Sequence, residues 1–447
     1  MTKSYILLTD PEAAGADSNP AEAPTTNSVG RLLVASMAGT TIEFFDFYIY
    51  ATAAVLVFPK LFFPNADPTT AKLQSLATFA LAFLARPIGS ALFGHFGDRI
   101  GRKATLVAAL LTMGISTVGI GLLPTYATIG IWAPALLAVL RFGQGFGLGG
   151  EWGGAVLLAT ENAPAGKAAI YGMFPQLGAP LGFICSTGAF LALDAALTDQ
   201  QLFSWGWRLP FIASAALVLV GLYVRLTLTE TPAFRRAIEN HERVRVPIVR
   251  LLSRHAPAVF LGMFAATATF VIFYLMTVFT LSWGTQRLGF TRPHFLVLQM
   301  IGVLFFAALI PLSALLAQRF GTIAILIIAS AAIAVFGLTT APLFGAGTTL
   351  GTLSYLCLGL ALMGVTYAPL GTALSELFPT EVRYTGASVS FNLAGIVGAS
   401  LAPNIATWLA SRFGLGAVGY YLSAAGAVSL VAALAIHRRP APPRGRL

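Results

Sequence analysis

The 447-residue chain is poor in charged residues and in cysteine. Only 10% of its residues are charged, whereas 57% are apolar. Soluble domains carry about 25% charged residues, so this composition excludes an ordinary soluble enzyme. The two cysteines, Cys185 and Cys357, each stand alone within an apolar stretch. Their number and spacing predict neither a disulfide framework nor a metal site.

The few charges are unbalanced, with 27 Lys and Arg against 17 Asp and Glu and a net charge of +10. A nucleic-acid partner requires Lys and Arg clustered on a polar, soluble face, which the apolar composition does not provide. In a membrane protein, an excess of Lys and Arg collects instead in the cytoplasmic segments. We therefore expect a lipid bilayer and no nucleic acid as the large-scale partner.

Long apolar runs fill most of the chain. A helix that crosses about 30 Å of hydrocarbon needs about 20 mostly apolar residues. These runs are continuous, whereas the strands of a membrane barrel would alternate in polarity. The sequence therefore predicts an all-α membrane protein with twelve transmembrane helices. They span Leu32 to Phe58, Leu73 to Phe93, Ala104 to Leu123, Ile129 to Leu158, Ala168 to Leu193, Leu209 to Leu228, Pro257 to Trp283, Phe295 to Ala317, Phe320 to Leu343, Thr348 to Leu374, Gly386 to Ala410 and Leu415 to Ile436.

The helices divide into two groups of six around a polar interval. We expect a disordered tail at 1–30, bundles at 31–228 and 257–436, a linker at 229–256 and a basic tail at 437–447. Most Lys and Arg fall on one side when both termini are placed in the cytoplasm, which predicts that orientation.

The two groups are related in sequence. The segment from Gly94 to Gly101 follows the second helix, and a similar segment from Ala314 to Gly321 follows the eighth. Glu161-Asn-Ala-Pro164 and Glu376-Leu-Phe-Pro379 form a second such pair at a nearly equal offset. Two related bundles are typical of transporters whose substrate site lies near the membrane midplane.

Specific motifs support a family assignment. Gly94-His-Phe-Gly-Asp98-Arg99-Ile-Gly101-Arg102-Lys103 resembles the loop signature of the major facilitator superfamily. Further segments resemble its metabolite:H+ symporter family, which includes proton symporters for proline and betaine, shikimate, 2-oxoglutarate and citrate. These segments are Thr41-Ile-Glu43-Phe-Phe-Asp46-Phe-Tyr-Ile-Tyr50, Arg86-Pro87-Ile-Gly89, Arg141-Phe-Gly-Gln144-Gly-Phe-Gly-Leu-Gly-Gly150-Glu151-Trp152, Trp207-Arg208-Leu-Pro210-Phe and Glu230-Thr-Pro232.

The resemblance also implies an inner gate, with a docking contact between Asp98 and the other half near Gly386. The second copy of the loop has Gln318 in place of the acid, so the gate is expected to be asymmetric. The expected members are Gly94, Asp98, Arg99, Gly101, Arg102, Glu161, Glu376 and Arg383. A simple cytoplasmic charge anchor is the alternative.

Five ionisable residues lie inside the predicted spans of the first half. An ionisable group costs several kcal/mol there, so each is a functional candidate. Glu43, Asp46, Arg86, Arg141 and Glu151 all fall roughly 15 to 22 Å from a helix end, counting about 1.5 Å per residue. Three acids against two arginines leave one carboxylate over. The alternative, that the five only neutralise one another and hold helices together, stays open.

We assign roles to these residues by their chemistry. Asp46 is the first candidate for proton coupling, followed by Glu43 and Glu151, since no histidine lies at that depth. Arg141 and Arg86 are candidate anchors for a substrate carboxylate, which a guanidinium can bind bidentately. The further candidate substrate contacts are Tyr50, Gln144, Gln176, Tyr274 and Asn392. For Tyr274 and Asn392 the alternative is helix packing, which buried Tyr and Asn serve more often.

Gly145-Phe-Gly147-Leu-Gly-Gly150 matches the spacing of a nucleotide-binding loop but lies inside a span with no strand before it. Glycines four residues apart instead predict a close approach between membrane helices.

Taken with the resemblance, these features predict a proton-coupled symporter in a bacterial inner membrane. It would import a small carboxylate-bearing metabolite or a zwitterionic osmolyte by alternating access, and the alternative is a drug or metabolite:proton antiporter. We expect no enzymatic activity, cofactor or metal, the proton gradient as the energy source, and a monomer as the functional unit.

Overall fold

The computed structural model describes residues 29–100, 102–161, 163–164, 166–227, 247–379 and 382–439. The predicted tails and most of the predicted linker lie outside these residues. Every regular element in the described part of the chain is a helix, which confirms the all-helical fold class.

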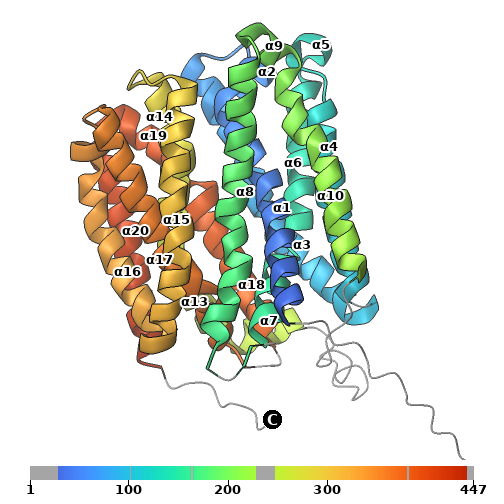
Figure 1. The fold of residues 1–447 in the computed structure, drawn as a ribbon, viewed down its shortest axis with the longest axis vertical. Helices are drawn as coiled ribbons and strands as arrows, with labels where there is room; N and C mark the ends of the chain where they lie inside the picture. The colour runs from blue at the N-terminus through green and yellow to red at the C-terminus, as the bar shows by residue number, and fades with distance from the viewer. Residues whose placement is uncertain are drawn as a thin grey trace, which may run out of the picture.

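Long helices of the first half run nearly the length of the molecule, and short ones cover one end (Figure 1). The long helices are α1 (Val29–Leu56), α3 (Pro68–Ile100), α4 (Arg102–Leu122), α6 (Trp132–Leu148) with α7 (Trp152–Glu161), α8 (Ala168–Ala196) and α10 (Leu209–Thr227). The short ones are α2 (Phe58–Phe62), α5 (Tyr126–Ile129) and α9 (Asp199–Ser204).

The second half has the same general form. Its helices are α12 (Pro247–Arg254), α13 (Ala256–Tyr274), α14 (Thr280–Gln286), α15 (Arg292–Phe320), α16 (Thr322–Phe336), α17 (Thr349–Glu376), α18 (Arg383–Gly395), α19 (Ala402–Phe413) and α20 (Leu415–His437). Gly321 and Gly414, with φ of 95° and 80°, end α15 and α19 and let the next helix begin at once. Glycine adopts such positive φ values without the steric cost that a side chain would bring.

Nine helical stretches in the described residues are long and apolar enough to cross a membrane, and Val107–Leu122 of α4 is a shorter apolar one. The other predicted spans fall on α1 and on α6 with α7. Glu43 and Asp46 lower the hydropathy of α1, and α6 and α7 are separated by non-helical backbone. Buried charges in α1 and a turn between α6 and α7 therefore distinguish these segments from the other spans.

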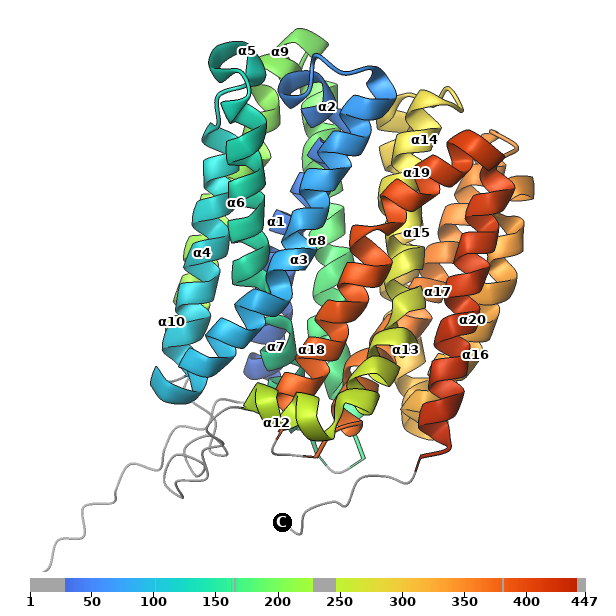
Figure 2. The same cartoon turned by 180° about the vertical axis from the view of Figure 1, so that it is seen from behind.

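The two ends of the molecule are distinguished by the short helices that lie there. We call the end with α2, α5 and α9 the outer end, because the distribution of Lys and Arg predicts that it faces away from the cytoplasm. The opposite end, with α12, is the inner end (Figure 2). This orientation stays a prediction.

The two halves stand side by side, and α8 lies against α15 (Figure 1) while α3 lies against α18 (Figure 2). Aromatic rings fill the middle of this junction. The ring centroid of Tyr48 on α1 lies 5.4 Å from that of Phe273 on α13. Those of Phe79 and Phe83 on α3 lie 5.6 and 5.5 Å from that of Tyr274. Each such pair contributes about 0.5–1.5 kcal/mol beyond the area it buries.

The glycines of α6 allow its backbone to approach α3. A Cβ atom on Gly145 would lie 2.2 Å from the carbonyl oxygen of Ala82, and one on Gly149 would lie 2.0 Å from that of Arg86. No real Cβ atom tolerates such a distance, so only glycine fits at these positions. The prediction that this glycine run serves helix packing is confirmed.

Candidate functional site

The fourth predicted span is interrupted where α6 ends and α7 begins. The chain forms a turn at 149–151, although Gly149 still has helical backbone angles. Backbone N–H and C=O groups that lose their hydrogen bonds within the helix need other protein partners at this depth, because lipid offers none. Tyr384 of α18 donates a hydrogen bond to the carbonyl oxygen of Gly150 at 2.9 Å. The break therefore places buried Glu151 beside a direct link between the two halves.

All five charged residues predicted inside the first half are buried. Their neighbours divide them into two groups. Asp46 lies among residues of the first half, whereas Glu43 and Arg86 interact electrostatically with tyrosines of the second half. Arg141 stands between the two groups, since Tyr50 and Tyr274 both act on it. Glu151 acts electrostatically on Asp46. The acids and arginines therefore extend from the core of the first bundle to the junction between the halves.

Asp46 has 0% exposure, and in the part of the chain that the structure describes neither carboxylate oxygen has a partner within hydrogen-bond distance. Its polar neighbours are Ser214 of α10 and Thr117 of α4. An ionised carboxylate is costly in such a place, because desolvation penalises the charged form. A proton could remove this cost, so the surroundings of Asp46 suit a group that gains and loses one.

Gln144, one helical turn along α6 from Arg141, links Arg141 to the backbone of α1. Arg141 donates a hydrogen bond to the Gln144 side-chain oxygen. The Gln144 amide donates to the backbone oxygen of Asp46 at 3.0 Å and to the Thr117 hydroxyl at 2.9 Å. The guanidinium of Arg141 also lies over the ring of Tyr50, 4.0 Å from its centroid. Gln144 thus positions Arg141 and the α1 backbone, and the structure does not leave its amide open to a solute.

Arg86 occupies the junction. Its guanidinium lies 4.6 Å from the ring centroid of Phe47 and 4.9 Å from that of Phe83. Tyr274, Glu43 and Tyr367 act on it electrostatically, and its Nε has no hydrogen-bond partner among the residues that the structure describes. The Arg86 guanidinium and the Glu43 carboxylate of the first half are therefore grouped with the tyrosine hydroxyls of the second half.

Tyr274 and Tyr367 bring the second half to this point. Tyr274 of α13 is buried against Phe79 and Phe83. Tyr367 of α17 is also buried, and its hydroxyl, with Trp152 as a polar neighbour, has no partner within hydrogen-bond distance among the described residues. An unpaired buried hydroxyl costs about 1–3 kcal/mol, so a solute oxygen at this point would find a ready partner.

Gln176 links the halves on the inner side of this point. Its side-chain oxygen accepts from Trp152 Nε1 at 3.2 Å, and its amide donates to the backbone oxygen of Tyr367 at 2.8 Å. Trp152 in turn stacks on Phe391 of α18, with ring centroids 3.5 Å apart. These contacts tie α7 and α8 to α17 and α18, so Gln176 serves a contact between helices in this structure.

The remaining predicted substrate contacts differ in setting. The Tyr50 hydroxyl shares a hydrogen bond with Thr78 at 2.7 Å, and Tyr50 lies within the first half. Asn392 is buried on α18 next to Phe391. Of the predicted contacts, Arg86 and Tyr274 lie together at the junction, whereas Arg141, Gln144 and Tyr50 form the group inside the first half.

Most of the expected inner gate is not covered by the structure. Gly101 lies outside the described residues, and so do the side chains at Gly94, Asp98, Arg99, Arg102 and Glu161. Glu376 accepts a hydrogen bond from Thr322 at 3.1 Å. Arg383 donates from Nε to the backbone oxygen of Phe378 at 3.4 Å. The gate stays a prediction.

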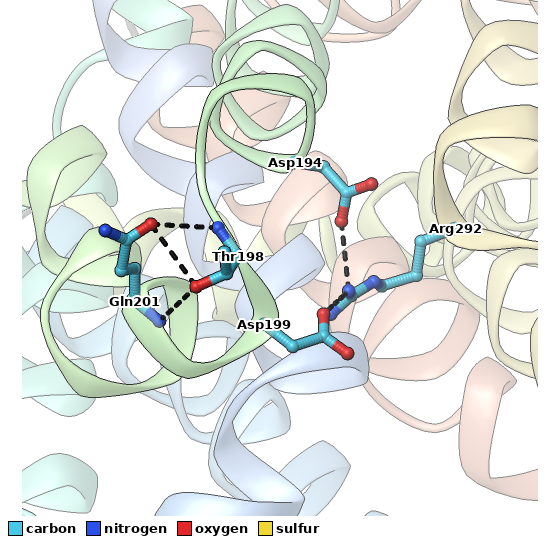
Figure 3. A network of polar contacts seen from close by, with 5 residues as sticks. All are labelled: Asp194, Thr198, Asp199, Gln201 and Arg292. Atoms are coloured by element: carbon cyan, nitrogen blue, oxygen red, sulfur yellow. Dashed lines mark hydrogen bonds and ion pairs between the residues drawn. The ribbon is translucent and has the colours of Figure 1, made fainter.

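The outer end carries an ion-pair group that sequence reasoning missed. Arg292, at the start of α15, pairs with Asp194 of α8 at 3.1 Å and with Asp199 of α9 (Figure 3). Thr198 and Gln201 form a capping box that begins α9 and sets the position of Asp199. The group joins the halves on the side opposite to Trp152 and Gln176.

The sequence analysis also missed two residues that contribute to the contacts around the candidate site. Trp152 and Tyr367 are apolar or neutral residues of spans, and their roles depend on neighbours from distant segments. Their polar atoms are the only signal that the sequence offers, because buried Tyr and Trp usually find a hydrogen-bond partner.

Known proteins resemble the chain over most of its length. Residues 32–254 match the family described as "Sugar (and other) transporter". The chain is 58% identical to the inner membrane metabolite transport protein YhjE of Escherichia coli, over 92% of this chain and 94% of that protein. It is 37% identical to the shikimate transporter of Escherichia coli, over 90% and 93%. A proline/betaine transporter of Salmonella typhimurium is 31% identical, over 91% and 83%.

Solved structures show the same fold. The crystal structure of a D-xylose-proton symporter matches with a TM-score of 0.71 at 19% identity, over 92% of this chain and 98% of that one. A partially occluded, inward-open structure of the xylose transporter XylE from E. coli matches with a TM-score of 0.70. The fold and the relatives are those of membrane transporters and not of enzymes. The chain therefore belongs to the major facilitator superfamily, among the metabolite transporters that include the shikimate and proline/betaine transporters.

Proposed function

We propose that the protein is a proton-coupled symporter that imports a small carboxylate-bearing metabolite or a zwitterionic osmolyte. The observation that carries this proposal is the group around Arg86. A guanidinium with a free Nε lies at the junction of the halves, next to Glu43 and Tyr274, and the unpaired Tyr367 hydroxyl lies nearby. Alternating access requires a site at this position, where both halves can contact the solute.

The chemistry of this group favours a carboxylate. Arg86 can hold a solute carboxylate, and tyrosine hydroxyls can donate to its oxygens or to a neighbouring hydroxyl group. A zwitterion would place its cationic end against Glu43 and the ring of Tyr48, since aromatic faces attract cations. The shikimate transporter and the proline/betaine transporters among the relatives support both classes.

Charge balance suggests how proton and solute are coupled. Glu43, Asp46 and Glu151 outnumber Arg86 and Arg141 by one negative charge when all are ionised. Protonation of one acid makes the group neutral. A solute carboxylate adds a further negative charge, which favours proton uptake, because an uncompensated charge at this depth is costly.

Asp46 is the proposed proton carrier. Its carboxylate has no hydrogen-bond partner among the described residues, whereas its backbone oxygen is bound by Gln144, which also holds Arg141. Gln144 therefore connects the Asp46 backbone to Arg141, and the ring of Phe47 contacts both Arg141 and Arg86. Release of the proton and of the solute on the same side would complete the cycle.

The remaining features of the proposal follow from the sequence. We place the protein in the bacterial inner membrane with both termini in the cytoplasm, and we expect it to work as a monomer. The proton gradient drives it without a cofactor. The E. coli relative described as an inner membrane protein supports this location.

A transport assay tests the proposal. Purified protein in proteoliposomes that contain a pH-sensitive dye is mixed with shikimate, proline, glycine betaine or 2-oxoglutarate. Symport predicts that at least one of them acidifies the lumen, and that a protonophore abolishes the signal. Alkalinisation of the lumen as the solute enters would instead support the antiporter alternative. No proton movement with any carboxylate would contradict symport.

A further inference from the structure

One face of α3 runs from the outer end to the candidate site. Lys72, Phe79, Phe83 and Arg86 are spaced by seven, four and three residues, which places them on the same side of a helix. Phe79 and Phe83 contact Tyr274 of the second half, so this side faces the junction. At about 1.5 Å per residue, Lys72 lies about 21 Å from Arg86 toward the outer end.

Lys72 is a buried cation that the candidate site does not use. The residue is 2% exposed, and its Nζ makes no hydrogen bond in the described part of the chain. Its charged neighbour is Arg287, which follows α14 in the other half and acts on it electrostatically. A buried cation on α3 and an exposed cation after α14 therefore lie within electrostatic range of each other at the outer part of the junction.

This arrangement is unfavourable as it stands. Like charges repel, and a buried ammonium ion without a partner pays a desolvation cost that only an opposite charge offsets. Lysine and arginine often bury their carbon chains and extend the charged end to water, but the Lys72 Nζ does not reach water here. An anion bound between the halves would offset both charges.

We propose that Lys72 and Arg287 form an outer binding site for the carboxylate of the transported solute. The carboxylate binds there when the outer end is open, before it passes the layer of Phe79, Phe83 and Tyr274 and reaches Arg86. Each half supplies one cation, so the bound carboxylate removes their repulsion and draws the outer ends of α3 and α14 together. This inference rests on the proposed function and adds a second, outer solute site to it.

Uptake kinetics test the site. The probe is whichever of shikimate, proline or glycine betaine the wild type transports, and the variants are Lys72→Met, Lys72→Arg and Arg287→Gln. A lost charge-assisted hydrogen bond predicts a KM for uptake from outside about tenfold higher in Lys72→Met. Lys72→Arg keeps the charge and should stay within about threefold of the wild type. Arg287 is exposed, so Arg287→Gln should have a smaller effect in the same direction.

Two controls separate this site from general effects. Arg412→Gln removes an exposed cation at the outer end of α19 and should leave the KM unchanged. The thermal unfolding temperature of Lys72→Met should equal or exceed that of the wild type, because the variant removes a buried charge without a partner.

The outcomes separate the two proposals. A wild-type KM in Lys72→Met would overturn the outer site and leave the proposed function intact. An equal rise in KM for Lys72→Met and Lys72→Arg would also overturn the outer site, since the shape of the side chain and not its charge would then matter. No transport of any carboxylate by the wild type would instead contradict the proposed function itself.

Discussion

The ion-pair group at the outer end gives a prediction whose size depends on the exposure of each acid. Arg292 of α15 binds Asp194 and Asp199, which belong to the other half (Figure 3). Opening of the outer end by separation of the halves must break these bonds. We therefore expect Asp194→Asn and Asp199→Asn to shift the protein toward the outward-open state by different amounts.

The exposed fraction of each aspartate determines how large an effect its replacement should have. The Asp194 side chain is 14% exposed and lies 3.1 Å from Arg292 Nη2, whereas the Asp199 side chain is 75% exposed. A partly buried hydrogen bond between charged groups is worth about 1.5–3 kcal/mol, which corresponds to a shift of about tenfold or more. An exposed pair is worth at most about 1 kcal/mol, or about fivefold. Asp194→Asn should therefore have the larger effect.

Spin-label distances measure this shift. Cysteines that replace exposed Gln200 on α9 and His294 on α15, in a protein whose Cys185 and Cys357 are changed to serine, report the separation of the halves at the outer end. Asp194→Asn should raise the population with the longer distance. An effect of Asp199→Asn that equals or exceeds that of Asp194→Asn, or no effect of either, would refute the reasoning.

Two further substitutions test the packing and the candidate site. Gly149→Ala places a Cβ atom 2.0 Å from the Arg86 backbone oxygen and should lower the unfolding temperature. Gly188→Ala is the control, because its Cβ atom would have no atom within 4 Å and should leave the unfolding temperature unchanged. Equal unfolding temperatures for the two variants would contradict the close approach of α6 and α3. Tyr367→Phe removes a hydroxyl that has no partner within hydrogen-bond distance among the described residues, so the unfolding temperature should be unchanged while the KM for the solute rises severalfold. An unchanged KM would remove this hydroxyl from the site.

The charged part of the site could be predicted from the sequence because charge inside a membrane is rare and costly. Glu43, Asp46, Arg86, Arg141 and Glu151 stand out in apolar runs for this reason, and the structure buries all five. Their division into two groups could not be predicted. It depends on which face of α1 meets Ser214 and Thr117 and which meets the second half, and helix spacing alone does not determine those neighbours.

The remaining parts depend on contacts between distant segments. Arg292 and Asp194 lie in different halves, and nothing in either segment indicates the other. The interruption of the fourth span was missed because Gly149 and Gly150 are compatible with a continuous membrane helix as well as with a break. The Tyr384 hydrogen bond to Gly150 distinguishes the two possibilities, and it comes from the other half of the chain.

The central claim is that a proton carried by Asp46 drives solute uptake, and Asp46→Asn tests it most directly. Proteoliposomes with the wild type or this variant are compared for proton influx coupled to solute uptake and for exchange of labelled against unlabelled solute. The account predicts that Asp46→Asn abolishes the proton influx and leaves solute exchange intact, because asparagine matches the neutral acid in shape. Proton-driven uptake by Asp46→Asn at the wild-type rate would contradict it.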